Sequence, residues 1–484
     1  MDVTTPGPLA ADVLSRDDVR RALQEHDFAA AFTLIKKWGG LSQNRIAATC
    51  RLTPGKVSTI VKGQHQITSI EVIRRIADGL RIPGALLGLA PRPWESTPSD
   101  PRPADAPDDR QPADDDVPWR PDATVALAGD LTRSDLVMDR RGASRALAAA
   151  AVTGSALLDP LEAWLQPAAA SPRARRVGRL GTRDVEQLEQ TAQAFRRWDH
   201  QHGGGLRRKA VLGQLAEVAA ALNEHQTDAV ESRLYRVMAH LSGTAATMAW
   251  DTGYHRRAQD YYRLALRSAH AAEDLIFGAN VLAGMARQML YRQQPQDALE
   301  LVRLAQEGTR RVAGPRVRAM LHTREAWALA AMGRTAAFRR TTEQAREALS
   351  ATAAHDDEPY WIAYFDEAEL AGVTGGRLLG LARQDRDQAE GAADHIRQAL
   401  DRRGPEAARS HALDRIGLAE CHFLAGDLTG AVQETHRAAD AAAQTASARV
   451  RDQLGELYSY TVGHSKARAV RDVRDRLREL LANR

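Results

Sequence analysis

The chain of 484 residues lacks several features that would assign it to a specialised class of protein. It has only two cysteines, Cys50 and Cys421, and both lie on apolar faces of expected helices. Such cysteines act as small buried hydrophobic residues in a reducing compartment. No uninterrupted apolar run reaches the roughly 18 residues of a membrane-spanning helix. We therefore expect a cytoplasmic protein without a transmembrane segment.

Sequence motifs of catalysis are also missing. The only Gly-Lys pair, Gly55-Lys56, continues with Val57, so the phosphate-binding loop of an ATPase is absent. No His-Glu-x-x-His, paired Cys-x-x-Cys or Gly-x-Ser-x-Gly motif occurs. The sequence therefore predicts a protein that is not an enzyme and that holds no cofactor and no metal ion.

Lysine is scarce, and its distribution is uneven. The hydrophobic content of 44% and the charged content of 26% are ordinary for a globular protein, and the length predicts two to four domains. The chain has six lysines against sixty arginines, and four of the lysines lie between residues 36 and 62. Residues 36–81 hold nine basic side chains and two acidic ones, although the whole chain is only +4. A local basic cluster of this kind favours contact with nucleic-acid phosphates.

Residues 42–63 have the pattern of two short helices joined by a tight turn. Ser42 is suited to cap the first helix, and Pro54 suits the start of the second, where no backbone N–H is needed. Gly63 is suited to end the second helix. The residues expected to face the core are Ile46, Ala47 and Cys50, followed by Val57, Ile60 and Val61. The other positions of the second helix are small, polar or basic, as required in a DNA major groove about 12 Å wide.

The flanking segments extend this motif to a bundle of five helices. Apolar residues at helical spacing are Phe28, Phe32, Ile35 and Trp38 upstream, and Ile70, Ile73, Ile76, Ala77, Leu80, Ile82, Leu86 and Leu87 downstream. Residues 27–90 resemble the XRE (Cro/repressor-type) DNA-binding domain. The resemblance is carried by Leu-Ser-Gln at 41–43, Val-Ser at 57–58, Lys-Gly at 62–63 and Ile-Ala-Asp-Gly-Leu at 76–80. We place this domain at residues 1–90; an ordinary helical bundle is the alternative.

The resemblance implies that the motif binds an operator in double-stranded DNA. Gln43 would hold a phosphate at the start of the first helix of the motif, and the outer face of the second helix would meet base edges. The residues expected at the DNA are Gln43, Asn44, Thr53, Pro54, Gly55, Lys56, Ser58, Thr59, Lys62 and Gln64.

Residues 91–125 are expected to form an acidic, proline-rich linker. Nine prolines lie between Pro91 and Pro121, and nine acidic residues face four arginines over the segment. Proline blocks regular structure, and net charge keeps such a segment extended. Residues 126–180 are then expected to form a connecting segment with an alanine-rich helix.

Residues 181–484 carry an internal repeat. Turn positions recur forty residues apart at Gly253, Gln293 and Gly333, and the same frame returns at Gly426. An apolar residue follows each turn by five positions, and a small residue follows seven positions later: Ala258 and Ala265, Ala298 and Ala305, Phe338 and Ala345, Ala431 and Ala438. Small residues at fixed spacing let antiparallel helices approach closely, and stacked pairs share one core. The pattern predicts a solenoid of helix pairs.

This solenoid resembles tetratricopeptide (TPR) repeats, although its period is near 40 and most large aromatic positions of that family are missing. The expected fold is therefore all-α, with an XRE-type five-helix bundle, a proline-rich linker and a TPR-like helical solenoid. In a solenoid the first helices of the pairs line a concave groove. The residues expected there as ligand contacts are His240, Trp250, Asn280, Arg287, Trp327 and Glu420.

The order of domains resembles that of actinobacterial XRE/TPR regulators. It is also similar to that of the peptide-responsive quorum-sensing receptors of Gram-positive bacteria. The resemblance implies a homodimeric transcriptional regulator whose repeats sense a peptide or small molecule. The alternative is a non-enzymatic scaffold in which the helix-turn-helix and the repeats both bind proteins.

Overall fold

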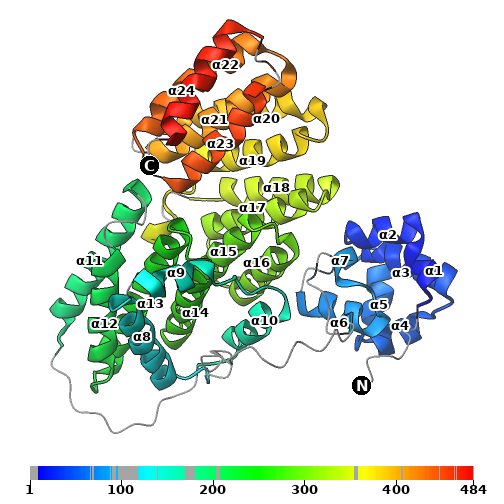
Figure 1. Ribbon diagram of the computed structural model, residues 1–484. Coiled ribbons are helices and arrows are strands. Elements are labelled where there is room, and N and C mark those ends of the chain that lie inside the picture. Colours follow the sequence, from blue (N-terminus) through cyan, green and yellow to red (C-terminus); the bar gives the residue numbers. More distant parts are fainter. Residues whose placement is uncertain are drawn as a thin grey trace, which may run out of the picture.

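The computed structural model describes residues 9–65, 67, 70–87, 89, 94–95, 118–138, 140–168, 180–202, 208–353, 358–404, 407–445, 447–462, 464 and 466–482. These ranges contain helices and turns and no β-strand, which confirms the all-α prediction. No helix within them is both long and apolar enough to cross a bilayer. Helices α1–α7 form one body, and the remaining helices form a second, larger one (Figure 1). Most of the linker expected at 91–125 lies outside the described residues.

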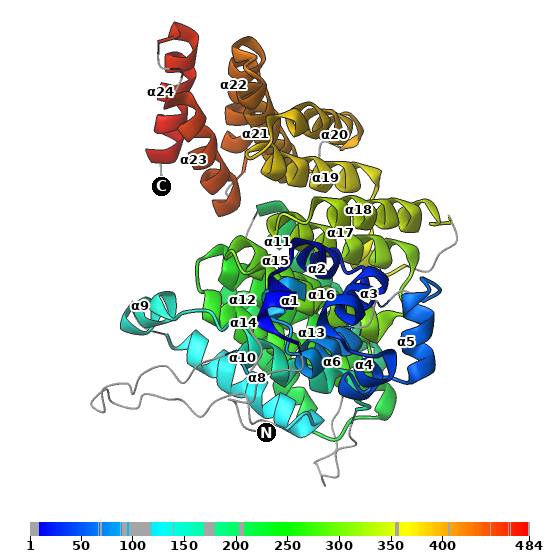
Figure 2. The same ribbon diagram turned by 90° about the vertical axis from the view of Figure 1, so that its right-hand side faces the viewer.

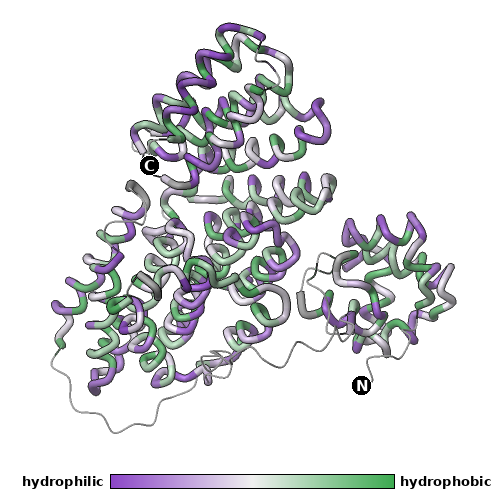
Figure 3. Tube along the Cα trace, viewed as in Figure 1, coloured by the Kyte–Doolittle hydropathy of each residue, from purple (hydrophilic) through white to green (hydrophobic). Residues whose placement is uncertain are grey.

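The N-terminal body has seven helices rather than the five that the sequence predicts. They are α1 (Ala11–Ser15), α2 (Asp17–Gln24), α3 (Phe28–Gly39), α4 (Gln43–Thr49), α5 (Pro54–Val61), α6 (Ile70–Leu80) and α7 (Gly84–Leu87). The two additional helices, α1 and α2, bury Val13, Val19 and Leu23 in the same core as Phe32 and Ile35. The Cα trace of this body carries hydrophobic and hydrophilic residues in alternation along its helices (Figure 3).

The expectation that Trp38 faces this core is wrong. Trp38 lies near the end of α3 and leaves 41% of its surface exposed. Its ring is covered by the guanidinium of Arg16 at 3.8 Å and the ammonium of Lys37 at 4.4 Å, and its Nε1 donates to Asp18 at 3.2 Å. The indole therefore joins α2 to α3 at the surface, where its polar edge has a partner.

Gly79 permits a close contact between α6 and the end of α4. A Cβ at this position would lie 2.3 Å from the backbone oxygen of Thr49. Any side chain would therefore push the two helices apart. The glycine in the Ile-Ala-Asp-Gly-Leu motif thus has a packing role, because it brings α6 against the helix that precedes α5.

The second body is an array of helices that begins earlier than the sequence predicts. Its elements up to the first described pair are α8 (Pro121–Leu136), α9 (Arg140–Ala148), α10 (Ser155–Leu158), the 3₁₀-helix η2 (Asp159–Leu165), α11 (Thr182–His202) and α12 (Arg208–Leu222). Helix α8 starts within the expected linker and packs against α12 and α14. It contributes Val125, Ala128 and Leu131 to the core of the array. The described helices between residues 126 and 168 therefore pack with the array and do more than connect two domains.

The rest of the array is built of helix pairs. Its elements are α13 (Asp228–Asp251), α14 (His255–Ala271), α15 (Leu275–Tyr291), α16 (Pro295–Thr309), α17 (Pro315–Ala331), α18 (Thr335–Ser350), η3 (Tyr360–Ile362), α19 (Glu367–Ala382), η4 (Arg386–Gln388), α20 (Ala389–Arg402), α21 (Ala408–Ala425), α22 (Leu428–Ala443), α23 (Ala448–Val462) and α24 (Arg468–Ala482). The pairs follow one another from α13–α14 to α23–α24 (Figures 1 and 2). Each odd-numbered helix from α13 to α23 contacts the next odd-numbered one, so we call these six the inner helices.

The repeat frame read from the sequence is confirmed. The four turn residues Gly253, Gln293, Gly333 and Gly426 all adopt positive φ, between 61° and 85°, at the junctions within their pairs. The apolar and small residues that follow them are buried in every pair: Ala258, Ala265, Ala298, Ala305, Phe338, Ala345, Ala431 and Ala438. Left-handed backbone is the usual way to end a helix, and glycine adopts it without strain.

Trp164 of η2 fixes the segment before α11 to the outer side of the array. Its indole is fully buried against α15 and α16. A Cβ on Gly278 would lie 2.6 Å from the indole and one on Gly308 would lie 2.4 Å from it. Two glycines thus form the slot that receives this side chain, and η2 becomes part of the array surface beside α16.

Candidate functional site

Helices α4 and α5 form a helix-turn-helix in which Ser42, Pro54 and Gly63 take their predicted positions, and Thr53 caps α5 in addition. The Ser42 hydroxyl accepts a hydrogen bond from the Arg45 amide at 3.2 Å, and the Thr53 hydroxyl accepts one from the Lys56 amide at 3.3 Å. Pro54 is the first residue of α5. Gly63, two residues after the last residue of α5, has a φ of 71°. These contacts satisfy donors that have no partner within the helix.

The core face of the motif is also as predicted. Ile46, Ala47 and Cys50 are buried, as are Val57 and Ile60, whereas Val61 is half-buried. Burial raises the pKa of the Cys50 thiol to about 12. The thiol therefore stays protonated and serves as a core residue.

The residues predicted to meet DNA share one exposed region around α5. The exposed members are Asn44, Thr53, Pro54, Gly55, Thr59, Lys62 and Gln64, and the half-buried ones are Gln43, Lys56 and Ser58. The Thr59 hydroxyl donates to the Lys56 backbone oxygen at 2.9 Å. A small, polar and basic face on a capped helix has the shape and the chemistry to enter a major groove.

Basic side chains on α3 and on the helix-turn-helix form no ion pair among the described residues. In the part of the chain that the structure describes, no ion pair involves Lys36, Lys37, Arg45, Lys56 or Lys62. Arg45 is exposed on α4, and Arg51 is exposed in the turn before α5. The sequence analysis did not single out either arginine, although both belong to the basic cluster at 36–81 and lie beside predicted positions. Unpaired cations on one face are available to phosphates.

The N-terminal body contacts the array through a different surface. Arg74 of α6 pairs with Glu300 of α16 and with Glu162 of η2. His26, in the turn before α3, accepts a hydrogen bond at Nδ1 from Arg303 of α16, at 2.7 Å. Burial, followed by the charges of Arg303 and Arg334, holds the pKa of His26 well below its usual value. In Figure 1, α6 faces the array and α5 lies beyond it, so this contact leaves the outer face of α5 exposed.

Three of the residues predicted for the concave groove come together. Arg287 of α15 lies 5.1 Å from the Trp250 ring of α13. Tyr291 of α15 packs edge-on between Trp250 and Trp327 of α17, with ring centroids 5.4 and 5.2 Å apart. Tyr291 is not among the predicted groove residues, although it lies four residues after Arg287 and so one turn further along the same face.

The other three predicted groove residues lie elsewhere or have partners of their own. Asn280 is half-buried on α15, two helical turns before Arg287. His240 stacks on Phe277 with a centroid distance of 3.9 Å and hydrogen-bonds the Tyr360 hydroxyl at 2.8 Å. Burial, then Arg196 and Arg236, lowers the pKa of His240 to about 3, so this imidazole is neutral. Glu420 is fully buried and pairs with Arg383 at 2.8 Å.

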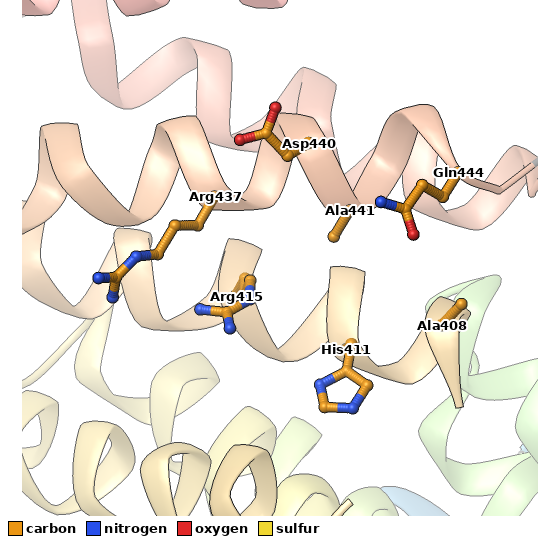
Figure 4. Close-up of a pocket in the computed structure, with 7 residues that line it drawn as sticks. All are labelled: Ala408, His411, Arg415, Arg437, Asp440, Ala441 and Gln444. Atoms are coloured by element: carbon orange, nitrogen blue, oxygen red, sulfur yellow. The ribbon is translucent and has the colours of Figure 1, made fainter. Parts of the chain in front are cut away.

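A separate shallow hollow lies between α21 and α22 (Figure 4). Its lining residues are Ala408, His411, Arg415, Arg437, Asp440, Ala441 and Gln444. Arg415 and Arg437 both pair with Glu434, and Asp440 pairs with Arg476. The charged groups of this hollow thus already have partners in the protein, unlike the arginine of the groove.

The comparison with protein families matches residues 14–89 to a helix-turn-helix domain. The match covers α2–α7 and therefore includes the whole exposed face of α5. The comparisons with curated proteins and with solved structures return no match.

Proposed function

We propose that this protein is an XRE-type transcriptional regulator, and not an enzyme, that binds an operator in double-stranded DNA in the cytoplasm. The observation that carries the proposal is the exposed face of α5, which is capped, small and polar, and flanked by unpaired Lys56 and Lys62. The match of residues 14–89 to a helix-turn-helix domain supports the same function. A helical bundle that binds only other proteins would not need these basic side chains beside α5.

The array would supply dimerisation and effector sensing, in the manner of TPR-like regulators. One short helix reads few base pairs, so useful affinity needs two copies on half-sites about 34 Å apart or a multiple of it. The N-terminal body is held by α16, and α15 and α17 contact α16 on the groove side. A ligand that binds one curvature of the array better than another would therefore change the position of the DNA-binding domain.

The first experiment selects an operator from random DNA with the full chain and then measures its affinity by fluorescence anisotropy. Lys56→Ala and Thr59→Ala should each weaken binding by about 1–3 kcal/mol and relax base preference, as loss of a base contact does. Lys209→Ala is the matched control, because Lys209 is an exposed lysine at the start of α12 and should leave affinity unchanged.

Sedimentation of the protein–operator complex completes the test. Two protein chains per operator with repeated half-sites are expected. Failure to enrich any sequence, or equal affinity of wild type and both α5 variants, would show that α5 does not read DNA. A single chain saturating one unrepeated half-site would refute the dimer but not the DNA-binding assignment.

A further inference from the structure

Five consecutive inner helices each carry one arginine whose charge acts on another arginine of the set. The arginines are Arg287 of α15, Arg324 of α17, Arg377 of α19, Arg409 of α21 and Arg449 of α23. Their charges act on one another: Arg287 is influenced by Arg324 and Arg449, Arg377 by Arg324, and Arg409 by Arg287 and Arg449. Like charges so placed repel, so the array holds them together against their electrostatic preference.

Aromatic rings lie beside three of these arginines and orient their planar guanidinium groups. Trp250, Tyr291 and Trp327 form a continuous row across α13, α15 and α17. Arg377 lies over Trp327 at 3.4 Å, and Arg449 approaches Trp250 to 5.8 Å. An aromatic face attracts a guanidinium but offers no hydrogen-bond acceptor in its plane. The Tyr291 hydroxyl accepts a hydrogen bond from Arg449, but the ring faces satisfy none of the other guanidinium donors.

Several of these donors are buried without a partner. The Nε atoms of Arg287, Arg377 and Arg449 have no hydrogen-bond acceptor, and neither the donor nor the acceptor capacity of the buried Tyr262 hydroxyl is used. Across the described ranges of the chain, no ion pair includes Arg287, Arg377 or Arg409. Buried polar groups are normally satisfied in native proteins, so a cluster of orphaned donors needs an explanation.

The acidic groups near the cluster are too few to neutralise it. Asp199 of α11 and Asp251 of α13 are the carboxyls that act on Arg409 and Arg449. Burial and the neighbouring Asp251 raise the pKa of Asp199 to about 6, so it is only partly protonated near neutral pH. Burial, with Arg449 as the next cause, lowers the pKa of Arg409 to about 10, and it remains charged. Glu369 of α19 acts on Arg377 but already pairs with Arg403. Five guanidiniums thus face three carboxyls, and the region has an excess of positive charge.

We infer that this aromatic-and-arginine cluster binds an anionic ligand, whose carboxylate or phosphate is held between the guanidiniums of the inner helices while an apolar part lies on the Trp250–Tyr291–Trp327 row. Guanidinium edges donate paired hydrogen bonds that match carboxylate and phosphate oxygens. The inference rests on the proposed sensing role of the array and defines the chemical class of its effector.

The binding test uses the full chain without DNA. Benzoate, phenyl phosphate and inorganic phosphate are titrated at constant ionic strength, with chloride as the compensating anion, and binding is followed by calorimetry and by tryptophan fluorescence. Saturable binding of benzoate or phenyl phosphate is expected, and the better of the two distinguishes a carboxylate effector from a phosphate effector. If inorganic phosphate binds and the two aromatic probes do not, the arginines bind an anion but the proposed role of the aromatic row is refuted. No saturable binding of any probe would overturn the inference.

Two variants separate a ligand site from a structural role. The double variant Arg287→Gln with Arg377→Gln should weaken anion binding by about 10- to 100-fold, since each change removes hydrogen bonds to a charged group. Its melting temperature without probe should fall less than that of Arg403→Gln, because relief of the repulsion between the arginines offsets the loss of the Arg377–Trp327 contact. Arg403→Gln should instead lower the melting temperature, because Arg403 pairs with Asp414 at 2.7 Å and Glu369 at 2.8 Å.

Arg318→Gln is the matched control for charge alone, because Arg318 is exposed on the same helix as Arg324. It should leave anion binding unchanged. Unweakened binding in the double variant, or destabilisation like that of Arg403→Gln, would overturn the inference. Operator affinity is measured in parallel: anion binding without operator binding would refute the proposed regulator alone, and operator binding without anion binding would refute the ligand site alone.

Discussion

The two bodies of this protein place their positive charge in opposite ways. Around α5 the cations are exposed or half-buried at the surface, and the core beneath them is apolar, with Val57 and Ile60 buried. In the array the cations point inward, where Arg287 and Arg377 lie against aromatic rings. Exposed charge is screened by salt and suits a long polyanion, whereas desolvated charge is screened little and suits a small anion that fits between fixed donors.

The largest effect is expected when an arginine, the residue type that the array places between its helices, is introduced into the core of the helix-turn-helix domain. Ile60→Arg buries a guanidinium in an apolar core, since Ile60 is 1% exposed and belongs to the same cluster as Val57 and Ile46. The cost should be about 3–5 kcal/mol, the penalty of an uncompensated buried charge, which is enough to unfold this domain. Limited proteolysis should then cut residues 9–89 while the array stays intact.

Lys62→Arg is the control for that substitution, because Lys62 is exposed at the end of α5. It should change the free energy of unfolding by no more than about 0.5 kcal/mol. If the domain stays folded with Ile60→Arg, its core accepts a buried charge, and the two bodies do not differ in this respect.

A second prediction extends the comparison to carboxyls. Asp297 of α16 is buried at 3% exposure and accepts a hydrogen bond from the Gly154 amide at 2.9 Å. Burial, despite that hydrogen bond, raises its pKa to about 6, and Glu300 adds to the effect. The folded protein therefore holds this proton to higher pH than the unfolded chain does. The stability that results is complete below pH ~4 and is lost as the pH rises through about 6.

Asp297→Asn keeps an oxygen for the Gly154 amide but cannot ionise. Relative to wild type, the free energy of unfolding of this variant should rise by about 2–3 kcal/mol between pH ~4 and pH ~7. Urea denaturation at several pH values measures the difference. A difference that stays constant, or that falls with pH, would show that Asp297 is not held protonated by its surroundings.

The smallest effect is expected for the contacts between arginine and tryptophan, one of which is compared in each body. Arg16 lies 3.8 Å from the exposed Trp38 ring, and Arg377 lies 3.4 Å from the Trp327 ring in the groove. Double-mutant cycles on stability should give a coupling energy of about 0.5–1 kcal/mol for the exposed pair and about 2 kcal/mol for the desolvated pair. Equal coupling energies would indicate that water reaches both guanidiniums alike.

The sequence predicts the elements that depend on local periodicity. Caps, turn residues and spacing locate α4 and α5, and the forty-residue frame locates Gly253, Gln293 and Gly333 in their turns. It does not predict α1 and α2, because helices of five and eight residues carry too few apolar positions to establish a period. The surface position of Trp38 depends on contacts with Arg16 and Asp18, twenty or more residues away in sequence.

The groove is predicted only where the repeat frame is regular. Trp250, Arg287 and Trp327 fall in that part and come together as expected. Arg377, Arg409 and Arg449 lie on α19, α21 and α23, where insertions break the frame, and their convergence is a property of the stacked array. Glu420 has the right register but pairs with Arg383, a choice of partner that no single-helix pattern contains.

Gly79 has a consequence for the genetics of this protein. The four glycine codons share their first two bases, so every missense change of one base gives a residue that carries a Cβ. At Gly79 that atom would lie 2.3 Å from the Thr49 oxygen, and none of these replacements avoids the clash. If the proposed function is right, a collection of spontaneous mutants that have lost operator binding should therefore contain changes at codon 79, which is not among the predicted DNA contacts, without regard to the chemistry of the new side chain.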